Sequence, residues 1–170
     1  MPHEKLTPMV KQVLFICTGN SARSVLAEGL LNHLGAGRFV AHSAGSQPTG
    51  RVNPLASSTL RSLGAAAEGH RSKSWDEFAA AGAPPLDFIF TVCDSAAGEA
   101  CPYWPGHPVT AHWGLPDPAA VQGSDDDKAR AFMATALVLR RRIERLLELP
   151  IASLDAATLQ ARLREIGQIA

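Results

Sequence analysis

The sequence predicts an α/β fold in which a parallel β-sheet is covered by helices on both faces. Short apolar segments alternate along the chain with segments of helical periodicity, a pattern typical of strands that are buried on both sides. The 170 residues are enough for one domain with a sizeable core. Several reactive side chains follow the ends of predicted strands. Because ligands of such sheets bind beyond the carboxyl ends of the strands, the sequence also predicts where the functional site lies.

The predicted elements of the first half alternate strand and helix after a polar leader. The helix that begins at Arg23 carries a stripe of leucines three or four residues apart, and Gly35 is a natural helix stop. Asn53 and Pro54 supply the cap and the first turn of the next helix. In order, we expect a leader (1–11), a strand (13–16), a helix (23–34), a strand (38–43) and a helix (54–63).

The second half adds two strands, a long helix and a last helix. A short helix over 75–81 precedes a strand over 87–92, and a strand over 109–113 is followed by a loop around Asp117. From about 127 to 147 apolar residues recur at helical spacing, and the basic run Arg140–Arg142 is interpreted as a solvated face of that helix. We expect one domain over 12–148, followed by a C-terminal helical extension over 149–170 with its helix at 155–166.

Composition and charge exclude several functional classes. Lys plus Arg and Asp plus Glu each number 16, so no global field favours nucleic acid or an anionic membrane. No apolar stretch approaches the ~18 residues of a membrane span, and the first residues do not resemble a signal peptide. We therefore expect a cytoplasmic protein. Three cysteines in a cytoplasmic protein do not indicate a structural disulfide framework, and an odd number leaves one of them unpaired in any arrangement. The number therefore suggests thiol–disulfide exchange instead.

The strongest functional signal is the segment 17–24, Cys-Thr-Gly-Asn-Ser-Ala-Arg-Ser, which directly follows the first strand. It places a sulfur inside a ring of backbone N–H groups and at the positive end of a helix dipole. Such a loop binds a tetrahedral oxyanion and lowers the pKa of a thiol, so the sequence predicts a cysteine nucleophile acting on an oxyanion. The nucleophile is Cys17, and the anion-binding residues are Thr18, Gly19, Asn20, Ser21, Ala22, Arg23 and Ser24.

Four further side chains have predicted roles around this loop. Arg23 would place two N–H donors on the anion, a planar task that lysine performs poorly. Ser24 either donates its hydroxyl to the thiolate or caps the helix, and both interpretations stay open. Asn20 tolerates a left-handed backbone angle and braces the loop. Asp117 is the candidate general acid for a departing oxygen, although Asp-Pro is also a common turn.

Cys93 ends the predicted third strand, and Cys101 follows in a loop of small residues. Strand-end cysteines are often inert apolar residues. Two of them at the sheet edge that also holds Cys17 suggest a redox relay, because a loop rich in glycine and alanine lets both sulfurs approach to bonding distance. The six histidines show no ligand spacing, and we expect no metal site.

Together these motifs resemble the arsenate reductases of the low-molecular-weight tyrosine-phosphatase superfamily. The resemblance covers roughly residues 12–148 and leaves out the leader and the helix after Pro150. It implies a four-stranded parallel sheet with helices on both faces. The matching stretches are Cys17–Ser24, Ala27–Gly29, His42–Gly45, Gly50–Pro54, Thr91–Asp94, Cys101–Pro102 and His112–Pro118.

The resemblance implies a triple-cysteine reduction of arsenate to arsenite. Cys17 attacks arsenate and Asp117 protonates the departing oxygen; Cys93 then attacks Cys17, and arsenite leaves. Cys101 next attacks Cys93 and presents a Cys93–Cys101 disulfide to an external thiol reductant. That reductant is thioredoxin, or glutaredoxin with glutathione, because the loop between the two cysteines is one residue longer than in thioredoxin-coupled members. Phosphate or sulfate would compete for the anion site, and no bound cofactor is expected.

Two alternatives come from other functional classes. A protein-tyrosine phosphatase needs Cys17, Arg23 and Asp117 but neither later cysteine. Phosphatases of this superfamily resemble one another in carrying aromatic residues after the Asp-Pro, where this chain has Ala119–Val121, so phosphatase activity is expected to be weak. A non-enzymatic anion sensor would leave the cysteine relay without a use.

Some members of the resembled family bind potassium beside the anion loop. Residues matching Asn20, Glu28 and Ser43 hold the ion, together with an aspartate where this chain has Lys73. An ammonium group at that place removes a cation ligand and supplies a cation. Lys73 is therefore expected to pair with Glu28 and to support Asn20 without potassium, the alternative being a solvated surface lysine.

Overall fold

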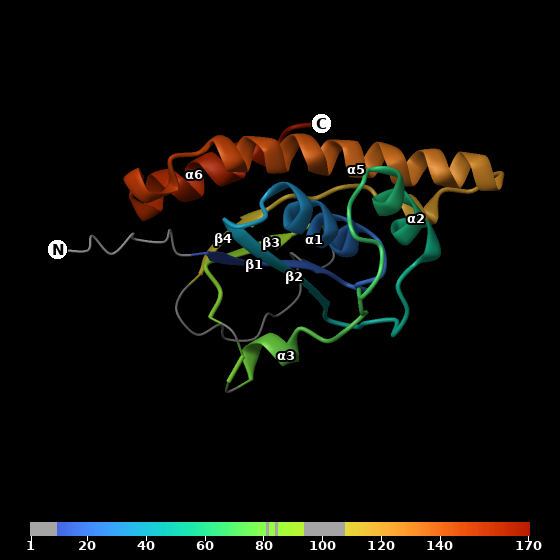
Figure 1. Cartoon of the computed structure of the whole chain (residues 1–170), viewed down its shortest axis with the longest axis horizontal. Helices are drawn as coiled ribbons and strands as arrows, with labels where there is room; N and C mark the ends of the chain where they lie inside the picture. Colours follow the sequence, from blue (N-terminus) through green and yellow to red (C-terminus); the bar gives the residue numbers. More distant parts are fainter. Residues whose placement is uncertain (1–9, 81, 84, 94–107) are drawn as a thin grey trace.

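The centre of the structure is a four-stranded sheet in which all strands are parallel, as the sequence predicts (Figure 1). The structure is a computed structural model that describes residues 10–80, 82–83, 85–93 and 108–170. The spatial order is β2-β1-β3-β4, so the first strand of the sequence lies inside the sheet. The strands are β1 (Lys11–Cys17), β2 (Phe39–Gly45), β3 (Phe88–Thr91) and β4 (Val109–His112).

Helices cover both faces of this sheet (Figure 1). The first helix and the two C-terminal helices lie on one face, and a short helix lies on the other. Packing of the first helix against the sheet and of the long helix against the first builds the thicker layer. The helices are α1 (Arg23–Leu34), α2 (Pro54–Ser62), α3 (Asp76–Ala79), α5 (Asp125–Glu148) and α6 (Ala156–Ile166), with 3₁₀ segments η1 (Pro118–Ala120) and η2 (Ile151–Ser153).

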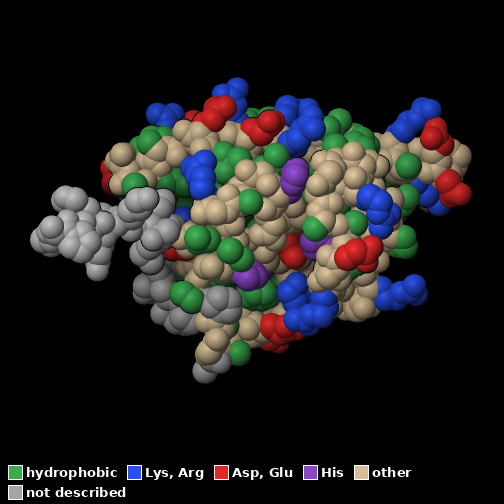
Figure 2. Space-filling view, in the orientation of Figure 1, with side chains coloured by type: hydrophobic (Ala, Val, Ile, Leu, Met, Phe, Trp, Pro, Cys, Tyr) green, Lys and Arg blue, Asp and Glu red, His purple; other side chains and the backbone are tan. Residues whose placement is uncertain are grey.

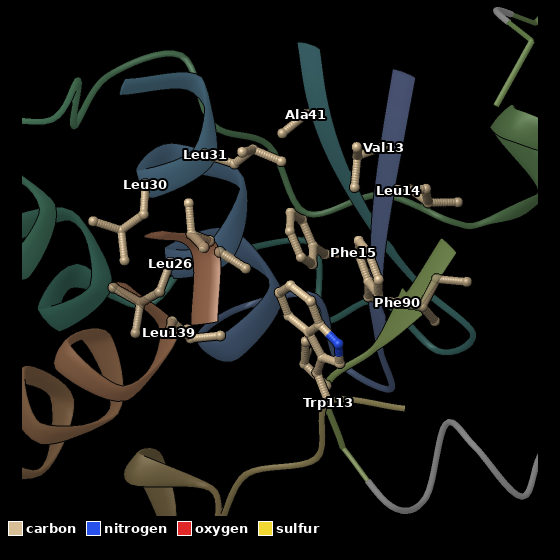
Figure 3. Close-up of a cluster of buried hydrophobic side chains, with 14 of the residues drawn as sticks. Val13, Leu14, Phe15, Leu26, Leu30, Leu31, Ala41, Phe90, Trp113 and Leu139 are labelled. Atoms are coloured by element: carbon tan, nitrogen blue, oxygen red, sulfur yellow. The ribbon is translucent and has the colours of Figure 1, made fainter. Parts of the chain in front are cut away.

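Aromatic rings fill the space between the sheet and the helices. Trp113 stacks on Phe90 with ring centroids 4.1 Å apart, and the Phe15 ring lies 5.6 Å from that of Phe90. Leu26 of α1 and Leu139 of α5 reach the same cluster (Figure 3). All five side chains are fully buried. Removal of this apolar surface from water is the main force that holds α1 and α5 on the sheet.

The helix starts follow capping signals in the sequence. The Asn53 side chain accepts a hydrogen bond from the Leu55 N–H at 2.9 Å, which confirms the predicted cap of α2. Ser124 and Asp127 form a reciprocal capping box, so α5 begins at Asp125, slightly before its predicted start. The predicted bounds of α1 agree with the structure at both ends.

Other element ends differ from the predicted bounds because long-range pairing decides them. β1 begins at Lys11, which the sequence assigned to the leader, because Lys11 pairs with Phe39 of β2. The rest of that leader, residues 1–9, lies outside the described residues. α3 covers only part of its predicted span, and neither 3₁₀ segment is expected from the sequence, since such short turns have no apolar period.

The predicted C-terminal extension shares the core of the domain that precedes it. α6 packs against β4 and α5. Its Leu159, Leu163 and Ile166 are buried in the same apolar cluster as the strands. The last helix is therefore a structural part of the sheet's covering layer.

The predicted solvated face at Arg140–Arg142 is wrong for its last residue. Arg140 and Arg141 are exposed, but Arg142 is only 4% exposed. It lies three residues after Leu139 and four before Leu146, on the inner stripe of α5. The helical period therefore places Arg142 inside, and its guanidinium finds backbone carbonyl partners there.

Charged side chains of both signs are interspersed over the face shown in Figure 2. Neither sign forms a continuous patch on that face, in keeping with the equal numbers of basic and acidic residues. In the part of the chain that the structure describes, no helix combines the length and the apolar character needed to cross a membrane.

Candidate active site

The carboxyl edge of the sheet gathers the predicted reactive side chains. Cys17 ends β1, Cys93 lies two residues after β3, and Asp117 lies in the loop after β4. Ile16 of β1 pairs with Thr91 of β3, and Thr91 pairs with His112 of β4, so the three strands end within one residue of the same level. The third predicted redox cysteine, Cys101, lies outside the described residues.

The loop between β1 and α1 turns its N–H groups inward. The carbonyl oxygens of Thr18, Gly19 and Ser21 accept hydrogen bonds from outside, from the N–H groups of residues 47, 49 and 53, at 2.9–3.0 Å. A trans peptide carries its N–H opposite its C=O, so the amides of residues 19, 20 and 22 point toward the centre of the loop. These donors at the start of α1 form a concave site that suits an oxyanion.

Two residues fix the path of this loop. Asn20 has a φ of +46° and is the sole non-glycine residue with positive φ in the described part of the chain. Gly45, at the end of β2, approaches the loop so closely that a Cβ there would collide with the Thr18 carbonyl oxygen. The predicted bracing by Asn20 thus has a conformational basis, and Gly45 is a residue that the loop requires.

A chain of hydrogen bonds points at the Cys17 sulfur. The Lys73 N–H donates to Asn20 Oδ1 at 2.9 Å, which turns the Asn20 amide nitrogen toward Ser24. That nitrogen donates to Ser24 Oγ at 2.8 Å. Because Ser24 Oγ accepts this bond, its own proton is free for Cys17 Sγ, 3.1 Å away. The cap position of α1 is Ala22, so the geometry favours the hydroxyl-donor interpretation of Ser24 over helix capping.

Cys17 and Cys93 form a buried pair of thiols. They are 4% and 2% exposed, respectively. The Thr18 N–H donates to Cys93 Sγ at 3.3 Å, so the second sulfur lies beside the peptide that follows Cys17. The hydrogen bond with Cys93 and burial raise the pKa of the Cys17 thiol, whereas Ser24 lowers it. The lowered pKa expected from the loop is therefore not found, because a second thiol competes for the proton.

Arg23 links the anion loop to the loop that carries Asp117. Its Nη1 donates to Leu115 O at 2.8 Å, and its Nη2 lies 3.8 Å from Asp117 Oδ2. Its Nε is buried without a hydrogen-bond partner among the described residues, so that donor is available to an anion. Asp117 Oδ1 accepts the Ala119 N–H at 3.0 Å and caps η1. Asp117 is therefore a turn residue and also carries a half-exposed carboxyl group beside Arg23.

A buried polar cluster lies behind the loop, and we name it the Glu28 cluster. Glu28 accepts a hydrogen bond from the Ser43 hydroxyl and lies 3.2 Å from His70 Nδ1. Lys73 Nζ donates to Arg71 O at 3.1 Å and lies 3.9 Å from Glu28. Burial would raise the pKa of Glu28, but the hydrogen bonds from His70 and Ser43 outweigh it and lower that pKa. The Lys73 side chain is 10% exposed, which does not fit a solvated surface lysine.

His70 is the member of this cluster that sequence reasoning missed. Its hydrogen bond to Glu28 raises its pKa, so an imidazole that the carboxylate makes easier to protonate lies beside Glu28 together with the Lys73 ammonium group. Glu28 and His70 are 42 positions apart, and no spacing rule connects them. A β-bridge between Gly45 and Ser74 brings the segment alongside β2. Among the described residues, no group of three or more His, Cys, Asp or Glu could hold a metal ion.

Comparison with known proteins identifies the family of this chain. A sequence model of the low molecular weight phosphotyrosine protein phosphatase family matches residues 12–161. The chain belongs to this family. The match extends beyond residue 148, the end of the predicted domain, and into α6.

Within the family, the chain is similar to several arsenate reductases. That of Bacillus licheniformis is 35% identical over 139 residues, which are 81% of this chain and 96% of the relative. A solved arsenate reductase in the phosphate binding state is 26% identical, with a TM-score of 0.63 over 81% of this chain and 97% of that one. The thioredoxin-dependent arsenate reductase of Corynebacterium glutamicum is 25% identical, with a TM-score of 0.54 over 82% of this chain and 64% of that one.

Proposed function

We propose that this member of the phosphatase family reduces arsenate to arsenite. The observation that carries the proposal is the second thiol, since Cys93 lies hydrogen-bonded beside Cys17 under the anion loop. Hydrolysis of a phosphate ester needs one sulfur nucleophile, whereas reduction of arsenic needs a second sulfur to attack the first. The relatives named arsenate reductase support the same activity.

In the proposed first step, Cys17 attacks arsenate that is held by the loop amides and Arg23. Asp117 gives a proton to the departing oxygen, which leaves as water while an As–S bond forms. Cys93 then attacks the Cys17 sulfur and the As–S bond breaks. Its electron pair stays on arsenic, which leaves as arsenite, and a Cys17–Cys93 disulfide remains. Arsenic gains two electrons, and the two thiols lose two.

Turnover then needs an external thiol reductant. We propose that Cys101 attacks Cys93 and that thioredoxin, or glutaredoxin with glutathione, reduces the resulting disulfide. The similarity to a thioredoxin-dependent arsenate reductase supports the first of these reductants. Both systems operate in the cytoplasm, where thiols are kept reduced, and we place the reaction there.

The alternative is a phosphotyrosine phosphatase, the activity for which the family is named. It would use Cys17, Arg23 and Asp117 in the same roles. The segment directly after Asp117, Pro118–Ala120, offers small side chains and no ring for stacking against a phosphotyrosine. We therefore expect weak phosphatase activity, and an anion sensor would have no use for Cys93.

A coupled assay tests the proposed activity. Reduced protein and arsenate should oxidise NADPH with thioredoxin and its reductase, or with glutaredoxin, glutathione and glutathione reductase, and comparison of the two mixtures identifies the reductant. Replacement of arsenate by phosphate is the control, because phosphate fits the loop but does not accept the two electrons. Phosphate release from an aryl phosphate, with no arsenate-dependent NADPH oxidation in either mixture, would favour the phosphatase.

We further propose that Lys73 and Glu28 support the anion loop from behind. Lys73 holds Asn20 through its backbone N–H, and its ammonium group lies near Glu28. A potassium ion at Glu28 would meet the Lys73 ammonium and the His70 ring, so the residues present do not fit a bound cation. The cluster therefore contains its own positive charge.

The reaction is accordingly expected to proceed equally well in potassium and in sodium salts at fixed ionic strength. Lys73→Ala should lower the free energy of unfolding by about 1 kcal/mol, because it leaves the largely buried Glu28 carboxylate without its ammonium partner. Urea unfolding and the coupled assay measure the two effects. Clear potassium-specific activation of the unmodified protein would refute this role of Lys73.

A further inference from the structure

Arg142 is a buried charge that the proposed reaction does not use. It lies on the inner face of α5, and within the described part of the chain it forms no ion pair with a carboxylate. Its nitrogens donate instead to three backbone carbonyls: Nη1 to Trp113 O at 2.6 Å, Nη2 to Gly114 O at 3.3 Å and Nε to Ile169 O at 2.9 Å. Burial of a guanidinium without a counter-ion is costly, so this arrangement needs an explanation beyond packing.

Two of these carbonyls belong to residues Trp113–Leu115, the stem of the loop that carries Asp117. On the other side of the stem, the N–H groups of Trp113 and Leu115 donate to the carbonyls of residues 91 and 92, at 2.7 and 3.1 Å. Both polar groups of the peptide between Gly114 and Leu115 are therefore hydrogen-bonded. Its C=O accepts from Arg142, and its N–H donates to the carbonyl of residue 92, just after β3. Such a peptide cannot rotate without the loss of both bonds.

The 113–115 stem leads directly to the anion site. The Leu115 carbonyl, one peptide further along, accepts the Arg23 Nη1 hydrogen bond at 2.8 Å. Two residues later, Asp117 Oδ2 lies 3.8 Å from Arg23 Nη2. A shift of the stem would therefore move a partner of Arg23 and the proposed general acid together.

The C-terminal end of α6 packs against the start of the stem. Trp113 is fully buried in the aromatic cluster of Figure 3, and its Nε1 donates to Leu163 O at 2.9 Å. A Cβ at Gly167 would collide with His112 O, so the helix end packs directly on the last residue of β4. Gly167 and Ile169 lie beyond residue 161, the last residue matched to the family.

We propose that Arg142, together with the end of α6, is a positioning residue that holds the 113–115 stem so that Asp117 reaches the departing oxygen. The inference rests on the proposed function, because Arg142 would act through the general acid. A stem held by apolar packing alone could slide, whereas a guanidinium fork fixes the direction of two successive carbonyls. The C-terminal segment thereby becomes part of the active-site scaffold.

A double-mutant cycle separates this positioning role from general stability. The variants are Arg142→Met, Asp117→Asn and the combination of both. Arg141→Met is the matched control, because it removes an exposed arginine from the same helix. The measurement is the rate of the first turnover of reduced protein with arsenate, followed as the loss of two free thiols at a temperature where each variant is folded by circular dichroism.

We expect Arg142→Met to slow the first turnover roughly 10- to 100-fold, and Arg141→Met to leave it unchanged. In the Asp117→Asn background the same change should slow it less than about twofold, because a carboxyl group is no longer there to be misplaced. Equal slowing in both backgrounds would overturn the inference and leave the proposed function intact. Absence of arsenate-dependent thiol loss in the unmodified protein would overturn both.

Arg142→Lys keeps the test decisive if the methionine variant does not fold. Lysine retains the charge and the aliphatic chain, but one ammonium group does not reproduce a fork that reaches three carbonyls. We expect a first turnover about tenfold slower and faster hydrogen exchange at the Leu115 amide. Unchanged turnover and unchanged exchange in Arg142→Lys would refute the positioning role.

Discussion

Cys93→Ser is expected to abolish turnover with arsenate while Cys17 still cleaves an aryl phosphate. A serine hydroxyl does not form a disulfide, so the As–S bond of the first step has no second sulfur to break it. Cys17→Ser should reduce both activities by roughly three or more orders of magnitude, because both begin with attack by the Cys17 sulfur. The measurements are NADPH oxidation with arsenate and release of the aryl alcohol, made on the same preparations.

Cys101→Ser supplies the control that dissects the relay. It should permit one turnover and then accumulate a Cys17–Cys93 disulfide, which peptide mass spectrometry detects. Equal loss of both activities in Cys93→Ser would show that Cys93 only packs beside the loop. Sustained turnover of Cys101→Ser with glutaredoxin and glutathione would show that Cys101 is dispensable and that glutathione reaches the first disulfide.

The anion loop could be predicted because its signals are local. The strand, the turn residues and the helix start are contiguous over 11–24, and the observed bounds of α1 are those that periodicity and Gly35 predict. The alignment of strand ends at one sheet edge follows from the parallel sheet itself. Local order and sheet topology together were enough to bring Cys17, Cys93 and Asp117 to one edge.

The properties that depend on contacts between distant segments could not be predicted in the same way. The pKa of Cys17 is raised by the thiol of Cys93, which lies just beyond the end of β3, although the loop alone would lower it. His70 lies beside Glu28 in a segment that a β-bridge pairs with the end of β2. Neither effect has a spacing signature in the sequence.

Arg142 is a different case, because the sequence pattern predicts its buried position, whereas its charge suggests a solvated one. The helical period places it on the buried stripe of α5 with Leu139 and Ile143. A run of three arginines nevertheless reads as a solvated face, since an isolated buried charge is rarely tolerated. The carbonyls that accept hydrogen bonds from its guanidinium belong to Trp113, Gly114 and Ile169, and no sequence periodicity connects these residues to α5.

Asp117→Asn is expected to slow the chemical step by roughly two to four decades, because the amide cannot protonate the departing oxygen. The substitution is conservative for the local structure. Asparagine caps helical turns as well as aspartate does, so it can still accept the Ala119 N–H. The expected loss therefore reports the missing proton rather than a displaced η1. The measurement is the first-turnover rate with arsenate, with the melting temperature as the check on folding.

Binding of the oxyanion should survive in the same variant. The carboxylate lies 3.8 Å from Arg23 Nη2, where it competes with an incoming anion for that guanidinium and repels the anion itself. Its removal should therefore leave the inhibition constant of phosphate unchanged or make binding tighter. If phosphate affinity instead fell in parallel with the rate, Asp117 would serve to hold Arg23 in place. The proton for the departing oxygen would then have to come from another group at the carboxyl edge of the sheet.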